Sequence, residues 1–173
     1  MGVRSKRKRK NLMKRGTLSI FFLISVVFLG GIQALGSVIK MSIKELTTKS
    51  DLIVVGKVID ATSKWATDRS NIYTYVTINV EEFIKGSHLT NEILIQVLGG
   101  AVEGEDIAEM VTDMPSFQKS ERVVLFLERS HSPEYFSVLT GQYGKFKVTP
   151  NNQIQARSTS LESFRQEIKK NLL

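Results

Sequence analysis

Apolar and polar side chains alternate along residues 72–84, and this alternation constrains the fold more than any other feature of the sequence. Because successive side chains of a β-strand point to opposite faces, a period of two predicts a strand over this segment. Phe83 breaks the alternation, as a bulge or the bend of a barrel strand does. One expected face carries Ile72, Thr74, Val76, Ile78 and Val80, and the other carries Tyr73, Tyr75, Thr77, Asn79 and Glu81.

Further short β-patterns are separated by turn signals, which is typical of a small antiparallel barrel or sandwich. Residues 51–61 begin apolar on both faces and predict a central strand. Gly56 and Gly86 are expected to relieve crowding at barrel corners. Two patterns flank Gly141 and predict a hairpin. The predicted strands are residues 51–61, 72–84, 92–98, 122–128, 135–140 and 143–149, with a short edge strand at 153–157.

Two helical patterns flank the strands. Residues 42–49 predict a short helix, and residues 161–172 predict a C-terminal amphipathic helix with Thr159 and Glu162 as its capping box. The long strand with a phase break favours a barrel over a sandwich. We therefore expect a mainly β domain: a small antiparallel β-barrel with a short N-terminal helix and a C-terminal amphipathic helix, which the family resemblance described below makes OB-like.

Residues 1–36 predict an export leader. Residues 1–15 are polybasic, a continuous apolar run follows, and Ala34 and Gly36 have the small-residue spacing of a signal-peptidase site. The alternative is an uncleaved N-terminal membrane anchor, because the extended run approaches the ~20 residues that span a bilayer. In both cases the positive-inside rule sends residues 37–173 across the membrane. We expect a protein that is secreted or anchored to the outer face of the cytoplasmic membrane, touching the membrane only through an uncleaved leader.

The basic net charge belongs to the leader. Residues 1–36 hold eight of the 24 basic residues and no acidic one, so 16 basic residues face 17 acidic ones in residues 37–173. The resulting net charge of −1 lacks the electrostatic footprint of a phosphate binder, and we expect no nucleic-acid partner. The chain has no cysteine, which excludes disulfides, thiolate zinc sites, cysteine nucleophiles and a lipobox anchor.

No catalytic constellation stands out in the sequence. His88 and His131 lie in polar turns without a second histidine at metal-ligand spacing. A G-x-S-x-G nucleophile signature, a Walker A loop and a dinucleotide fingerprint are all absent. We therefore expect no enzyme and no cofactor.

The connection at residues 99–120 is the best candidate for a functional segment. At 22 residues it exceeds the ~12–15 beyond which loops are uncommon and usually functional or disordered. Its carboxylates suggest either a solvated loop or a calcium site, although the spacing is not that of an EF-hand. Its apolar residues predict that it packs partly on the barrel, either as a partner-contacting loop or as a plug of the barrel end. The candidate contact residues are Glu103, Glu105, Asp106, Glu109 and Asp113.

The order of these segments resembles a known group. The segments are DLIVVGKV (51–58), YTYVTINV (73–80) running to FIKG (83–86), ILIQVLGG (93–100), ERVVLFLE (121–128) after Phe117, and GQYGKFKV (141–148). They resemble small secreted bacterial and archaeal domains that are similar to the netrin-like domain of the tissue inhibitors of metalloproteinases, over residues 42–148. The resemblance implies an OB-type five-stranded barrel. The animal inhibitors chelate the protease zinc through an N-terminal cysteine, which this chain lacks, so that mechanism does not transfer.

The expected function is that of an exported, non-enzymatic binding module that contacts an extracellular protein or a cell-envelope component. The alternative is a cysteine-independent inhibitor or accessory domain for a secreted metallopeptidase. A hydrolase that uses the acidic loop is the third hypothesis, and it requires carboxylates that converge in a concave pocket.

Overall fold

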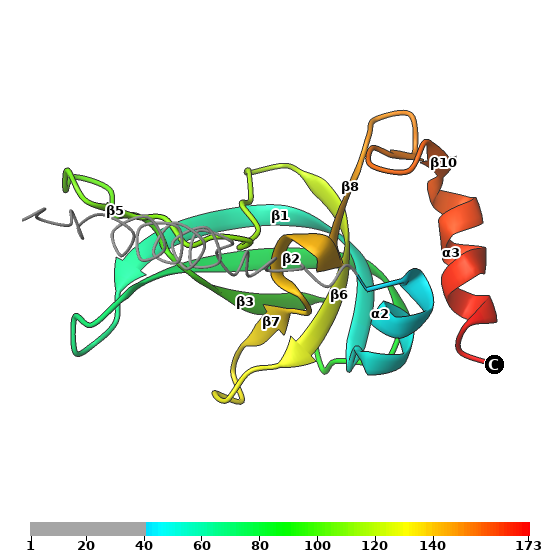
Figure 1. Cartoon of the computed structure of the whole chain (residues 1–173), viewed down its shortest axis with the longest axis horizontal. Helices are drawn as coiled ribbons and strands as arrows, with labels where there is room; N and C mark the ends of the chain where they lie inside the picture. The colour runs from blue at the N-terminus through cyan, green and yellow to red at the C-terminus, as the bar shows by residue number, and fades with distance from the viewer. Residues whose placement is uncertain (1–40) are drawn as a thin grey trace, which may run out of the picture. The chain divides into compact units, whose positions relative to one another are not determined.

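The computed structural model describes residues 41–173, which form a mainly β fold with 44% strand (Figure 1). The predicted leader, residues 1–36, lies outside the described residues. None of the helices in the described part has the length and apolar character needed to span a membrane. The elements are α2 (Ile43–Lys49), β1 (Leu52–Trp65), β2 (Ile72–Lys85), β3 (Glu92–Leu98), β4 (Gly100–Ala101), β5 (Ala108–Glu109), β6 (Arg122–Arg129), β7 (Phe136–Val138), a 3-10 turn (Gly141–Gly144), β8 (Lys145–Val148), β9 (Gln153–Ile154), β10 (Thr159–Ser160) and α3 (Leu161–Lys170).

Five strands close into the predicted OB-like barrel. Around the ring, β1 pairs with β2, β2 with β3, β3 with β7, β7 with β6, and β6 with β1. Four of these pairings are antiparallel, and β3 meets β7 in a parallel bridge at Ile95 and Phe136. The barrel is therefore mixed, and the expectation of a wholly antiparallel barrel was wrong in this detail. The reason is topological: strand directions can alternate completely around a closed ring only if the number of strands is even.

The predicted hairpin around Gly141 does not form. β7 and β8 both pair with β6, β7 through Val138 and Leu127 and β8 through Val148 and Arg122. Between them Thr140 and Gly141 both have positive φ, and the chain continues into a 3-10 turn instead of a tight β-turn. Strand β6 is long enough to pair with both segments, so β7 and β8 each pair with β6 and not with one another.

Strands β1 and β6 are apolar on both faces because they separate two cores. The inner core fills the barrel with side chains from all five of its strands, including Val54, Ile78 and Leu125. The outer core lies between the opposite faces of β1 and β6 and the elements α2, α3, β8 and β9, and includes Ile53, Phe126 and Phe164. The prediction that residues 51–61 start as a central strand is confirmed.

The phase break in β2 is a real irregularity of the ladder. The register with β1 shifts between the pairs Val55–Glu82 and Gly56–Val80, which leaves Glu81 unpaired in the bulge. As a result Phe83 packs on the inner core, whereas its neighbour Ile84 joins the outer core. Gly56 lies at this bend, where an added Cβ would stand 2.8 Å from the Asn79 carbonyl oxygen. Glycine is therefore required there for close backbone approach, as expected.

Both predicted helices are present, with caps that are partly different from those expected. Ser42 and Glu45 form a capping box at the start of α2. At α3 the capping residue is Ser160, whose side chain accepts a hydrogen bond from the Ser163 amide, so the predicted Thr159–Glu162 box was wrong. Thr159 is instead paired with Ile154 in β10, one residue before the cap.

Candidate binding surface

Residues 99–120 cross one end of the barrel, and α3 lies toward the other end (Figure 1). β4 and β5 form a small hairpin in which Ala101 pairs with Ala108. We call residues 102–110 the loop tip and residues 111–117 the loop base. The tip is built by the turn between the two short strands, whereas the base runs back onto the barrel toward β6.

Glu105 ties the tip to the end of β1. Its carboxylate accepts a hydrogen bond from Trp65 Nε1 at 3.0 Å and lies 3.9 Å from the Arg69 guanidinium. Arg69 in turn stacks over the Trp65 ring, 5.4 Å from the ring centre. β1 is longer than the predicted 51–61, because the strand continues to Trp65. This extension carries the tryptophan to the loop.

Two further carboxylates anchor the segment, one to a backbone amide and one to a side-chain amide. Glu109 accepts a hydrogen bond from the Ile72 amide at 2.7 Å, and Asp113 accepts one from Gln142 Nε2 at 2.9 Å. Gly100 has a φ of +140° and packs against the side chains of Ser63 and Thr74, so no other residue fits there without strain. These contacts hold the loop in one position relative to the sheet.

The five predicted contact residues are therefore not gathered in one place. Glu105 and Glu109 bind the paired residues Trp65 and Ile72, Asp113 binds Gln142, and Glu103 and Asp106 are exposed at the tip. Within residues 41–173, no group of three or more His, Cys, Asp or Glu side chains is placed to hold a metal ion. The convergence that a calcium site or a carboxylate hydrolase requires is not seen in this loop.

Apolar side chains of the loop point to solvent instead. Met110 is 96% exposed and Ile107 is 47% exposed, both in the tip, and Met114 of the base is 40% exposed. A loop tip that is anchored by carboxylates and exposes Met110 and Ile107 is the reverse of an ordinary solvated loop. Exposed apolar groups that cluster on one element are typical of an interaction site.

The loop base is fastened to the barrel by apolar and ionic contacts. Phe117 packs on the inner core and Pro115 is buried. Lys145 donates to the Ser116 carbonyl, forms an ion pair with Glu121 at 2.8 Å, and lies 4.5 Å from the centre of the Phe117 ring. The segment therefore packs partly on the barrel through its base, as expected, while Met110 and Ile107 of its tip are exposed.

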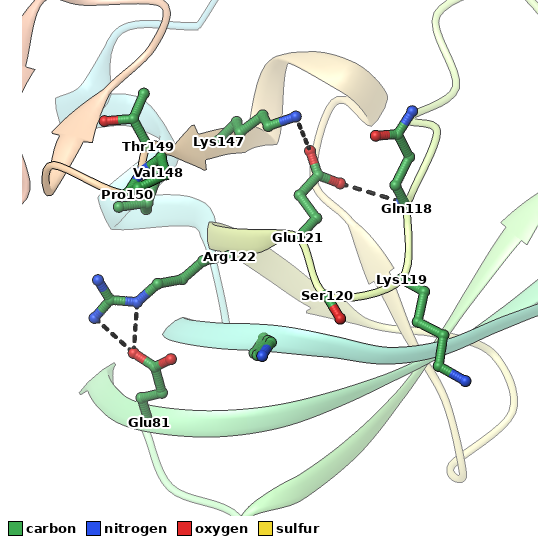
Figure 2. Close-up of a pocket in the computed structure, with 11 residues that line it drawn as sticks. Glu81, Gln118, Lys119, Ser120, Glu121, Arg122, Lys147, Val148, Thr149 and Pro150 are labelled. Atoms are coloured by element: carbon green, nitrogen blue, oxygen red, sulfur yellow. Dashed lines mark hydrogen bonds and ion pairs between the residues drawn. The ribbon is translucent and has the colours of Figure 1, made fainter.

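A pocket of about 520 Å³ borders the end of this segment (Figure 2). Figure 2 shows both of its carboxylates paired with basic side chains: Arg122 reaches Glu81 at 2.6 Å, and Lys147 reaches Glu121 at 3.6 Å. Glu121 also accepts a hydrogen bond from the Gln118 amide at 3.3 Å. Because both carboxylates neutralise basic neighbours, this pocket is held together by its own ion pairs.

A second pocket, of about 330 Å³, lies between the loop and the extended part of β1 and β2. Ala61 and Ser63 of β1 line it, and Ser63 is 2.9 Å from Thr74 of β2 through their hydroxyl oxygens. Met110 and Val111 line it from the loop side. This pocket therefore lies where the loop meets β1 and β2.

Both histidines, Glu82 and Asp68 lie outside the loop. His88 is exposed and packs edge-on against Phe136, with 5.9 Å between ring centres, and His131 is exposed. Glu82 forms an ion pair with Arg165 of α3 at 2.7 Å. In the turn after β1, hydrogen bonds from the Ser70 hydroxyl and amide lower the pKa of Asp68.

The contacts of Trp65 and Lys145 escaped sequence reasoning. Trp65 and Glu105 are 40 positions apart, and Lys145 and Ser116 are 29 positions apart. No local pattern marks such pairs.

No known family model matches the chain, and no curated protein matches it.

Proposed function

We propose that this protein is a non-enzymatic binding module that contacts an extracellular protein or a cell-envelope component through the loop tip. The observation that carries the proposal is the exposure of Met110 and Ile107 on a loop whose carboxylates are used for anchoring. A loop that is already ordered loses little entropy on binding, which favours recognition by preformed contact. An inhibitor or accessory domain of a secreted metallopeptidase is the special case in which the partner is a peptidase.

Two surface variants test the proposal. The variants Ile107→Ser and Met110→Ser are purified from the producing cells and compared with the control Leu89→Ser. Leu89 is exposed as well, but it lies in the connection between β2 and β3. Cross-linking to the native envelope fraction, followed by quantification of the captured partner, is the measurement. We expect both loop variants to lose the partner and the control to keep it, with unchanged melting temperatures. Retention of the partner by both loop variants would show that the tip is not the contact surface.

A further inference from the structure

One edge of strand β1 is open over its last part. β2 pairs with β1 along its whole length, but on the opposite edge β6 reaches only Leu52–Lys57. Val58 adds one more pair of hydrogen bonds, to the Glu121 carbonyl at 2.8 Å and from the Ser120 amide at 2.9 Å. From residue 59 to residue 65 no backbone group in the described part of the chain bonds this edge. We call these residues the open edge.

The alternation of antiparallel pairs shows which groups face outward. The Ala66 amide donates a hydrogen bond to the Asn71 carbonyl at 2.8 Å. In an antiparallel ladder every second pair is hydrogen-bonded, so Lys64 and Thr62 of β1 direct their backbone groups toward β2 in the same way. The intervening residues Ala61, Ser63 and Trp65 turn their N–H and C=O groups away from β2. In a sheet such groups are bonded by a neighbouring strand.

The pocket of about 330 Å³ extends over the face of the sheet from β3 to the open edge of β1. Ala61 and Ser63 line it at the edge, Thr74 of β2 and Val97 of β3 line it farther in, and Met110, Met114 and Phe117 line it from the loop. Side chains of a strand alternate between faces, so a strand added at the open edge would direct every second side chain toward this pocket. The mainly apolar walls suit an aliphatic or methionine side chain.

The charge beside the open edge restricts the occupant further. Residues 99–118 contain five acidic side chains and no lysine or arginine. Glu103 and Asp106 are exposed at the tip, and Glu109 lines the pocket. An extended segment that carries basic residues is therefore complementary in charge, whereas an acidic one is repelled.

We propose that the open edge binds an extended, basic peptide segment of a partner protein by strand addition, with an apolar side chain of that segment in the adjoining pocket. The inference rests on the proposed binding function and names the chemistry of the partner. The unpaired backbone groups of Ala61, Ser63 and Trp65 supply the hydrogen bonds, the pocket selects the apolar side chain, and the loop tip selects the positive charge.

The probe is the most enriched peptide from a random dodecapeptide phage library selected on the purified protein. We expect enriched sequences to be basic, with apolar residues at alternate positions. Each amide of the synthetic peptide is then N-methylated in turn, and the dissociation constant is measured by calorimetry. Strand addition predicts losses of about tenfold or more at every second amide, and only small losses between them, because every second N–H bonds the edge. Uniform losses, or losses at one end only, would overturn the proposal.

Variants of the protein locate the binding. Ala61→Pro removes an outward N–H without touching a bond to β2, and we expect it to weaken the peptide at least about tenfold. Met110→Ala opens the pocket wall and is matched by Leu89→Ala at a similarly exposed position. If Ala61→Pro does not fold, the alternation of the N-methyl effects along the peptide still decides whether it binds by strand addition.

The remaining outcomes separate this inference from the proposed function. A selection that yields no basic alternating peptide refutes strand addition, as does a dimer whose formation Ala61→Pro abolishes, because the edge would then belong to a second copy. If the native partner depends on Ile107 and Met110 but not on Ala61, the binding function stands and the open edge is not its site. If the peptide binds at the edge while the partner ignores the loop tip, the edge stands and the proposed contact surface is wrong.

Discussion

The two ends of the domain are held by different kinds of contact. At the helix-covered end the contacts lie on the outer face of β1 and β6 and are apolar. Phe164 of α3 is fully buried and packs edge-on against Phe126 and close to Phe146, with ring centres 6.3 Å and 5.0 Å apart. At the loop-covered end the tip is held by polar groups, because the carboxylates of Glu105 and Glu109 bind partners on β1 and β2. The helix belongs to the outer core, whereas the loop tip is held at the surface by hydrogen bonds.

The difference separates stability from recognition. Burial of aromatic side chains contributes strongly to the free energy of folding but leaves nothing for a partner to touch. Polar anchors contribute less, yet they hold a loop in place while its apolar side chains remain outside. The loop-covered end can therefore present Met110 without weakening the domain. The following predictions test this contrast, beginning with the largest expected effect.

Phe164→Ala should lower the free energy of unfolding by about 3–5 kcal/mol, because it leaves a cavity in the outer core. Leu172→Ala, at an exposed position shortly after the same helix, should change it by less than about 0.5 kcal/mol. Urea denaturation measures both. A small effect of Phe164→Ala would mean that the helix-covered end does not dominate stability.

Glu109→Ala should cost about 1–3 kcal/mol, because it leaves the partly buried Ile72 amide without its acceptor. Hydrogen exchange of the Ile72 amide should accelerate, whereas Glu103→Ala, which removes an exposed carboxylate of the same loop, should leave it unchanged. Equal exchange in the two variants would contradict the anchoring role of Glu109.

Glu105→Ala should reduce stability by no more than about 1 kcal/mol, because the Trp65–Arg69–Glu105 group is largely exposed. Trp65 is the only tryptophan of the chain, so its fluorescence reports this contact alone. We expect a shift in emission for Glu105→Ala and none for Asp106→Ala. An unchanged spectrum in Glu105→Ala would show that the tip is not held by Trp65.

The smallest effects concern two exposed carboxylates, one at each end. Hydrogen bonds from Ser42 lower the pKa of Glu45, and those from Ser70 lower the pKa of Asp68. A lowered pKa stabilises the fold above the ordinary pKa of the group, and this contribution is lost as the pH falls through the lowered value. Ser42→Ala and Ser70→Ala should each raise the pKa of their own carboxylate in an NMR titration and leave the other unchanged. A shift at both carboxylates in either variant would indicate that the two ends are coupled.

Much of the fold could be predicted because it rests on local alternation. The period of two over β2 and the displaced Phe83 foretold a bent barrel strand, and the doubly apolar start of β1 foretold its place between two cores. The pairing of the two segments around Gly141 could not be predicted from local alternation. Turn residues are a local signal, but whether β8 pairs with β7 or with β6 depends on the length of β6.

The loop shows the division between sequence and tertiary structure most clearly. By itself the sequence determined that residues 99–120 are long, acidic and partly apolar, because these are properties of composition. Only the tertiary structure decided that Glu105 and Glu109 bind inward while Met110 and Ile107 face outward. Glu105 binds a partner 40 positions away along the chain, and Glu109 binds one 37 positions away. Residues so far apart meet only when the loop folds over the extended parts of β1 and β2. The open edge of β1 has the same origin: its residues form an ordinary strand pattern, and the edge is open because β6 begins at Arg122 and pairs only as far as Lys57.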